Sequence, residues 1–257
     1  MLFALIVTGV VFSMKQGGKA VVRSAAVPEA VRAAPDKSPS LAERGEASLL
    51  AEAEPLVRRF LGTTSLEDSL PLVRNPAQAE ARMREFYPTG TIKAPGLVEF
   101  NTGESFAILG KFVALRVRTR EHEEKLIALM ETPQGLKIDW ESWVDWSEIS
   151  WEKFLSTKPV SEHVFRVTLS AVDYYNFSFA DESKWRSYRL VSVDGENSIY
   201  GYVEKGSVLE QQIRPDAEAK GIALMLSLKF PADATVSNQV EIVSMVSGGW
   251  VDQGDSP

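Results

Sequence analysis

The 257-residue sequence predicts an α+β protein, in which helices lie on a curved, cone-like antiparallel sheet and a small five-stranded β-barrel follows. Three observations predict this class. Apolar residues recur at helical spacing between residues 49 and 61. They then alternate with polar residues between 106 and 141, as in long antiparallel strands. Beyond residue 160, three strand-like runs, one short helical segment and two more strand-like runs follow one another.

Composition divides the chain into six segments. We expect a membrane anchor or signal at 1–14, a linker at 15–45, an α+β domain at 46–147, a connecting helix at 148–161, a β-barrel domain at 162–252 and a tail at 253–257. The linker is assigned because residues 25–46 are rich in Ala, Pro and Ser and have little to bury.

The apolar run Leu2–Met14 would span ~20 Å as a helix, against a hydrocarbon core of ~30 Å. Basic residues follow the run, beginning with Lys15 and Lys19, and none precedes it. We interpret the run as a clipped membrane anchor, with a cleaved signal or a buried helix as alternatives. The basic residues favour a cytoplasmic body if nothing precedes Met1, but a longer N-terminus would reverse this. We expect a single-pass inner-membrane protein whose body is periplasmic.

Charge and residue usage exclude several classes of site. The net charge is -7. Residues 1–45 hold six Lys/Arg and three Asp/Glu, so the remainder carries -10 and is poorly suited to bind nucleic acid. The absence of Cys removes thiolate metal sites and thiol nucleophiles, and the two histidines, His122 and His163, cannot form a three-histidine site. Since no phosphate loop, dinucleotide fingerprint or nucleophile elbow is present either, we expect no catalytic, cofactor-binding or metal-binding residues and no cofactor.

Local signals place the elements of the first domain. The first helix has an apolar face between Leu49 and Leu61 and encloses Pro55, and Gly62 is a plausible end. Ser65 and Asp68 have capping-box spacing before a short helix at 65–73, and Asn75-Pro76 predicts the start of a third helix with Asn75 as its cap. The expected strands are Phe106–Thr119, Lys125–Glu131 and Leu136–Trp140.

The order of helices followed by a strand meander resembles the nuclear transport factor 2-like (cystatin-like) superfamily over about 100 residues. The stretches Leu70–Arg74, Ile138–Glu141 and Trp151–Phe154 are similar to ones found in uncharacterised bacterial membrane-anchored proteins of this kind. The resemblance implies packed helices on a curved sheet and implies no activity.

Four tryptophans lie within twelve residues, interleaved with carboxylates: Trp140, Trp143, Trp146 and Trp151. Flat aromatic rings beside carboxylates can bind sugars or cations, whereas the structural alternative is burial in the core and between domains. Trp143 and Trp146 are therefore candidate binding residues. Asp139 or Glu141 could act as an acid–base group in a cone pocket with His122, although His122 also fits a solvated hairpin bend.

The expected strands of the second domain are Val164–Tyr175, Trp185–Val193, Ser198–Glu204, Ile222–Phe230 and Gln239–Val246. A helix opens at Ser207, with Glu210 at capping-box spacing, between the third and fourth of these strands. This order resembles the OB-fold, many members of which bind single-stranded nucleic acid. Residues 163–257 carry eight Lys/Arg against thirteen Asp/Glu, which opposes that function. Tyr174 and Tyr175 are instead candidate residues of a protein-contact loop, or else of a packed strand end.

These observations predict a membrane-tethered, noncatalytic binding or scaffold protein of the bacterial cell envelope, held through residues 1–14, with an unidentified protein partner and no nucleic acid. Two alternatives stay open. One is a hydrolase or isomerase that uses the cone pocket of the first domain, and the other is a glycan-binding protein.

Overall fold

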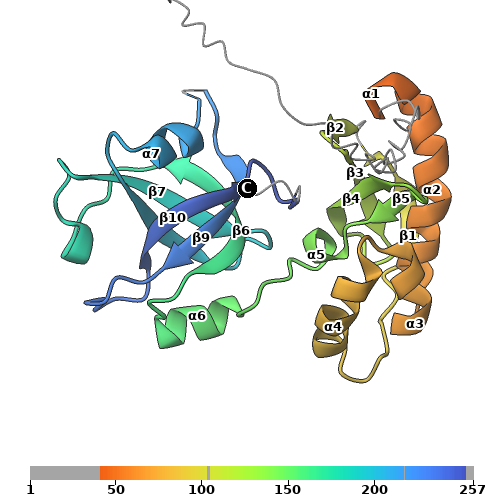
Figure 1. Ribbon diagram of the computed structural model, residues 1–257, viewed down its shortest axis with the longest axis horizontal. Coiled ribbons are helices and arrows are strands. Elements are labelled where there is room, and N and C mark those ends of the chain that lie inside the picture. Colours follow the sequence, from red (N-terminus) through yellow and green to blue (C-terminus); the bar gives the residue numbers. More distant parts are fainter. Residues whose placement is uncertain (1–40, 103–104, 217, 253–257) are drawn as a thin grey trace, which may run out of the picture. The chain divides into compact units, whose positions relative to one another are not determined.

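The computed structural model describes residues 41–102, 105–216 and 218–252. It has the expected α+β class, with helices on a curled antiparallel sheet and a closed five-stranded barrel (Figure 1). No described helix is both long and apolar enough to cross a bilayer. The anchor or signal expected at 1–14, most of the linker and the tail at 253–257 lie outside the described residues.

The helices of the first part precede its sheet. They are α1 (Leu41–Arg44), α2 (Glu46–Gly62), α3 (Leu66–Ser69), the 3-10 turn η1 (Leu70–Leu72) and α4 (Pro76–Phe86). The expected linker reaches residue 45, yet Leu41 is buried in the first core. Ser65 caps α3 as expected, by accepting a hydrogen bond from the Asp68 amide. Asn75 does not cap α4 with its side chain, because its backbone adopts a left-handed conformation at φ 46°.

Five strands form the sheet of the first part: β1 (Leu97–Phe100), β2 (Ala107–Leu109), β3 (Phe112–Thr119), β4 (Glu124–Thr132) and β5 (Gly135–Ile138). They pair antiparallel in the order β1-β3-β4-β5, with β2 on β3, and α2 packs against β1 and β5. Phe106–Thr119 is therefore a tight hairpin rather than one strand, because the chain reverses at Gly110, where φ is +61°.

The sheet ends earlier than the alternating pattern suggested. β5 stops at Ile138, and Trp140 opens α5 (Trp140–Trp143) instead of continuing the strand. The Asp139 amide donates the last bond to the sheet, to Ala128 O at 2.9 Å, and Asp139 O then accepts from the Trp143 amide. Asp139 thus lies where strand becomes helix. The connecting helix α6 (Trp151–Thr157) is capped by Ser150.

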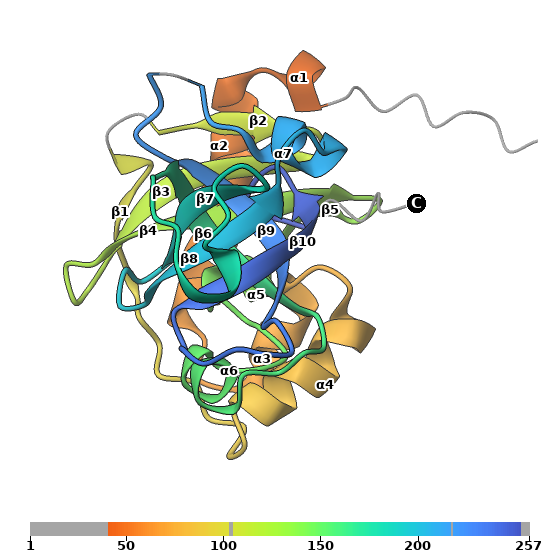
Figure 2. The same ribbon diagram turned by 90° about the vertical axis from the view of Figure 1, so that its left-hand side faces the viewer.

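The second part is a closed barrel of β6 (His163–Ala171), β7 (Trp185–Ser192), β8 (Ser198–Glu204), β9 (Ile222–Lys229) and β10 (Gln239–Ser247). The strand order is β10-β8-β7-β6-β9, and β9 closes onto β10. Within the barrel β8 and β10 pair in parallel and the other neighbouring strands pair antiparallel, and Figure 2 shows β8 and β10 beside each other. With α7 (Val208–Ile213) between β8 and β9, the barrel is OB-like.

The loop between β6 and β7 starts sooner than expected, since β6 ends at Ala171 and not near Tyr175. It contains the 3-10 turn η3 (Phe177–Phe179). Asp173, Tyr174 and Tyr175 therefore belong to a loop, not to a strand end.

Candidate functional site

The first two tryptophans of the cluster are core residues. Trp140 packs edge-on against Phe86 and close to Tyr87, with ring centroids 5.6 and 6.2 Å away. Trp143 is buried and meets Phe60 edge-on at 6.2 Å. Both indoles are therefore almost fully buried in the core, at 2% and 8% exposed.

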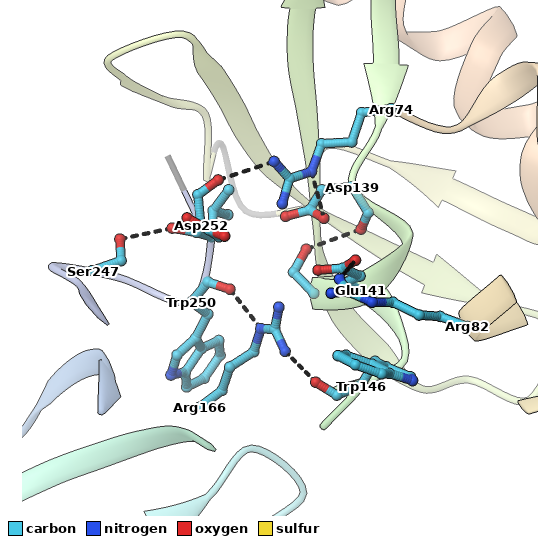
Figure 3. A network of polar contacts seen from close by, with 11 residues as sticks. Arg74, Arg82, Asp139, Glu141, Trp146, Arg166, Ser247, Trp250 and Asp252 are labelled. Carbon is cyan, nitrogen blue, oxygen red and sulfur yellow. Dashed lines mark hydrogen bonds and ion pairs between the residues drawn. The ribbon is translucent and has the colours of Figure 1, made fainter. Parts of the chain in front are cut away.

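Trp146 is partly buried and is covered by a cation. The Arg82 guanidinium lies over the Trp146 ring, 4.2 Å from the centroid. The Trp146 carbonyl accepts a 2.6 Å hydrogen bond from Arg166 Nη1. The side chain of Arg82 also forms an ion pair with Glu141. Trp146 therefore belongs to a polar network that connects several elements (Figure 3).

Asp139 is at the centre of this network. Its Oδ1 accepts a 3.0 Å hydrogen bond from Arg74 Nε, while Arg74 Nη1 donates to the Asp252 carbonyl at 3.0 Å. The Asp139 side chain is 0% exposed, and its Oδ2 has no hydrogen-bond partner among the described residues. Burial raises the pKa of Asp139, and the nearby charges of Arg74 and Arg166 oppose that rise.

Arg166 lies in β6 and is buried. Besides its bond to the Trp146 carbonyl, its Nε donates to the Trp250 carbonyl at 2.7 Å. Burial lowers the pKa of Arg166, against the attraction of Asp139 and Asp145. Burial also raises the pKa of Asp145 to about 6, against the attraction of Arg166.

A pocket of about 160 Å³ opens beside Asp139 at the start of α4. Its lining is mostly polar: Arg74, Asn75, Gln78, Ala79, Arg82, Asp139, Trp140, Glu141 and Asp252. The pocket brings together the two carboxylates that the sequence singled out, Asp139 and Glu141, and each is paired with an arginine.

His122 is not part of this pocket. It lies exposed in the hairpin between β3 and β4, at φ 63°. The Asp139 amide bonds to Ala128, which lies four residues along β4 from Glu124, at the hairpin end of the strand. Four residues of strand span about 13 Å. An acid–base pair requires ~3 Å or one bridging water, so His122 does not complete one with Asp139.

The barrel carries a second cluster, in the loop between β6 and β7. Tyr174 stacks on Tyr200 at 4.0 Å, and Phe179 stacks on Tyr202 at 4.1 Å with nearly parallel rings. The Tyr202 hydroxyl donates to Tyr174 O at 3.0 Å. These contacts hold the loop against the face of β8 that carries Tyr200 and Tyr202.

Polar bonds hold the same loop from β10. Gln239 Nε2 donates to Asn176 Oδ1 at 2.5 Å and to the Tyr202 hydroxyl at 2.8 Å. Between these anchors Phe177 is 58% exposed, and its backbone is left-handed at φ 50°. A non-glycine residue pays about 1–3 kcal/mol for that conformation, which persists when its neighbours enforce it. Tyr175 lies two residues before Phe177, and the Lys205 ammonium lies 5.7 Å from the centroid of the Tyr175 ring.

The four candidate binding residues thus fall into two places. Trp143 and Trp146 belong to the first part, one in the core and one in the arginine–carboxylate network, whereas Tyr174 and Tyr175 belong to the barrel loop. The sequence did not single out Arg74, Arg82 or Arg166 as site residues. Arg166 left a weak signal, because it is the charged residue within an otherwise uncharged stretch, Val164–Leu169.

Within the described residues no group of three or more His, Cys, Asp or Glu side chains could hold a metal ion. No protein-family model, curated protein or solved structure matches this chain.

Proposed function

We propose that this chain is a membrane-tethered, noncatalytic binding module of the bacterial cell envelope, which docks a protein partner through the barrel loop Asp173–Phe177. The observation that carries the proposal is Phe177, a large apolar side chain exposed on a strained backbone. Strained residues cluster where proteins contact ligands. Exposed aromatic side chains with few rotatable bonds are typical anchors of protein–protein interfaces.

The anchoring of the loop supports this proposal. Stacking of Tyr174 on Tyr200 and the bond from Gln239 to Asn176 fix the loop before Phe177. Stacking of Phe179 on Tyr202 fixes it after Phe177. A preorganised loop loses little conformational entropy on binding, so more of the contact energy appears as affinity.

The same loop argues against nucleic acid as the partner. OB barrels bind oligonucleotides on the face of their second and third strands, which correspond here to β7 and β8. In this barrel Phe179 covers Tyr202 on that face and contacts Trp185 edge-on at 5.0 Å. Together with the acidic charge of residues 163–257, the covered face favours a protein partner.

The first part of the chain would present the barrel at the membrane. The order of its helices and its curled sheet are compatible with the nuclear transport factor 2-like superfamily, to which we propose it is related. The tether through residues 1–14, with a periplasmic body, belongs to the same proposal and rests on the apolar sequence of that segment.

The enzymatic alternative has one observation in its favour, since Asp139 and Glu141 line one pocket. Each carboxylate is paired with an arginine, and His122 lies on a distant hairpin. A binding function fits this arrangement better than acid–base catalysis.

The proposal is tested by affinity capture of the full-length, tagged chain from native membranes, comparing wild type with Phe177→Ala. Loss of an interface anchor of about 2 kcal/mol would reduce binding of a purified partner roughly thirtyfold. Val208→Ala is the matched control, because Val208 is also a large exposed apolar side chain, 71% exposed, but lies on α7. A partner retained equally by Phe177→Ala and Val208→Ala would contradict the proposal. Fractionation of the same membranes tests the tether.

A further inference from the structure

The pocket at the start of α4 has no role in docking through the barrel loop. We propose that it is a second binding site, which takes a neutral, polyhydroxylated ligand: one sugar ring or a polyol of similar size. This inference is independent of the protein-docking proposal, because it rests on different residues.

Asp139 supplies the first argument. Its side chain is fully buried, lines the pocket and leaves Oδ2 without a partner among the described residues, while Arg74 holds Oδ1. An unpaired buried carboxylate oxygen is costly, so a native protein normally satisfies it. The ligand group that satisfies it is a hydrogen-bond donor, such as a hydroxyl.

The charges of the pocket supply the second argument. Its arginines are already paired, Arg74 with Asp139 and Arg82 with Glu141. A charged ligand would compete with one of these pairs, and removing one partner of a buried ion pair is strongly unfavourable. A neutral ligand leaves both pairs intact.

The remaining polar groups determine the ligand class. Asn75 and Gln78 line the pocket at the start of α4, and each amide can both donate and accept hydrogen bonds. A hydroxyl also donates and accepts, so vicinal hydroxyls can bond to Asp139 and to an amide together. An apolar ligand would leave these groups unpaired.

The volume restricts the ligand to one ring. The pocket volume of about 160 Å³ is close to that of a cavity of about 150 Å³ that holds one benzene ring. Drug-sized ligands occupy pockets of roughly 300 Å³ or more. A single sugar residue, free or at the end of a glycan, is therefore the appropriate size.

Isothermal titration of the purified full-length chain with glucose, galactose and myo-inositol tests this site. We expect saturable binding of at least one of them, and no saturable binding of acetate or glycine, which carry charges. Maltotriose distinguishes the two sources: binding as tight as glucose indicates a terminal glycan residue, and loss of binding indicates a free sugar.

Two variants place the binding in this pocket. Asp139→Asn replaces the acceptor Oδ2 with a donor and should weaken binding about tenfold, the equivalent of one charged hydrogen bond. Gln78→Ala removes one exposed amide, favours the helix and should weaken binding about threefold. Gln212→Ala, at an exposed glutamine of α7, is the matched control and should bind like wild type.

If Asp139→Asn does not fold, Gln78→Ala decides, because its side chain is exposed on the surface of α4. The inference is overturned if none of the neutral polyols binds to folded wild type, or if only acetate or glycine binds. Equal affinity of Gln78→Ala and Gln212→Ala for the polyol would also overturn it.

Discussion

Asp145 is a partly buried carboxyl group whose proton affinity depends on the fold. Burial raises its pKa from an ordinary value of 3.8 to about 6, and the Arg166 charge opposes that rise. The folded chain therefore binds this proton more tightly than the unfolded chain. As a result, this group stabilises the fold least above pH 6, and stability falls as the pH rises from about 4 to about 6. The rise in the pKa of Asp145 to about 6 corresponds to about 3 kcal/mol.

We predict that Asp145→Asn raises the free energy of unfolding at pH 7 by about 1–3 kcal/mol and flattens its dependence on pH between 4 and 6. Asn also suits the left-handed backbone of this residue, at φ 52°. Urea unfolding at pH 4, 5, 6 and 7 measures both effects. Asp173→Asn, at an exposed loop carboxylate, is the control and should leave the pH profile of wild type unchanged. A variant profile as steep as that of wild type would refute the role of Asp145.

Among the elements, α7 depends most clearly on side chains at its first turn. Ser207 Oγ accepts from the Glu210 amide at 3.1 Å, as the capping-box spacing predicts. Glu210 is only 3% exposed; its Oε2 accepts from the Gly206 amide at 2.7 Å, and its Oε1 accepts from Arg214 and Arg186. The carboxylate thus joins the helix start to β7 and to the following loop.

We predict that Ser207→Ala costs about 1 kcal/mol of stability, and that Glu210→Ala costs about 3 kcal/mol because two cations and a backbone amide lose their partner. Chemical denaturation of both variants measures the difference. Ser150→Ala removes the equivalent cap of α6 and calibrates the cost of a cap alone. Equal costs for Glu210→Ala and Ser207→Ala would mean that the buried carboxylate contributes no more than a cap.

Local signals predicted the elements best where a contact is local. The predicted caps Ser65 and Ser207 each bond three residues ahead, and β8 lies where its alternation places it, at Ser198–Glu204. Predictions that depended on the backbone of one residue were less accurate. Asn75 has the right side chain for a cap but adopts a left-handed conformation, and Trp140 follows the strand alternation yet starts a helix.

The candidate sites were predicted only in part, because their contacts are distant in sequence. Asp139 and Glu141 could be singled out as acidic residues near an expected strand end. Their partners could not, since Arg74 lies 65 residues from Asp139 and Arg82 lies 59 residues from Glu141. The same holds for the barrel loop, where Gln239 reaches Asn176 across 63 residues. The type of a residue indicates what chemistry its side chain can perform, whereas the fold determines which distant side chain it pairs with.

At the scale of the whole molecule, the apolar residues form two separate cores, one from Leu41 to Trp143 and one from Phe154 to Ile242. Hydrogen bonds from two arginines connect chain segments that belong to different cores or flank them. Arg166 in β6 donates to the carbonyls of Trp146 and Trp250, and Arg74 donates to the Asp252 carbonyl. Hydrogen bonds from a buried cation are worth about 1.5–3 kcal/mol each. Such bonds can make two cores unfold together even though each has its own apolar interior.

We therefore predict that wild type unfolds in one calorimetric transition, and that Arg166→Met separates it into two. The variant keeps the bulk of the side chain but removes both hydrogen bonds and the positive charge that faces Asp139 and Asp145. Each core then unfolds at its own temperature, and the calorimetric enthalpy exceeds the van't Hoff enthalpy. Arg189→Met is the matched control, because Arg189 is an exposed barrel arginine whose Nε donates to nearby Ser198. A single, uniformly shifted transition in Arg166→Met would mean that the two cores are coupled through contacts other than this arginine.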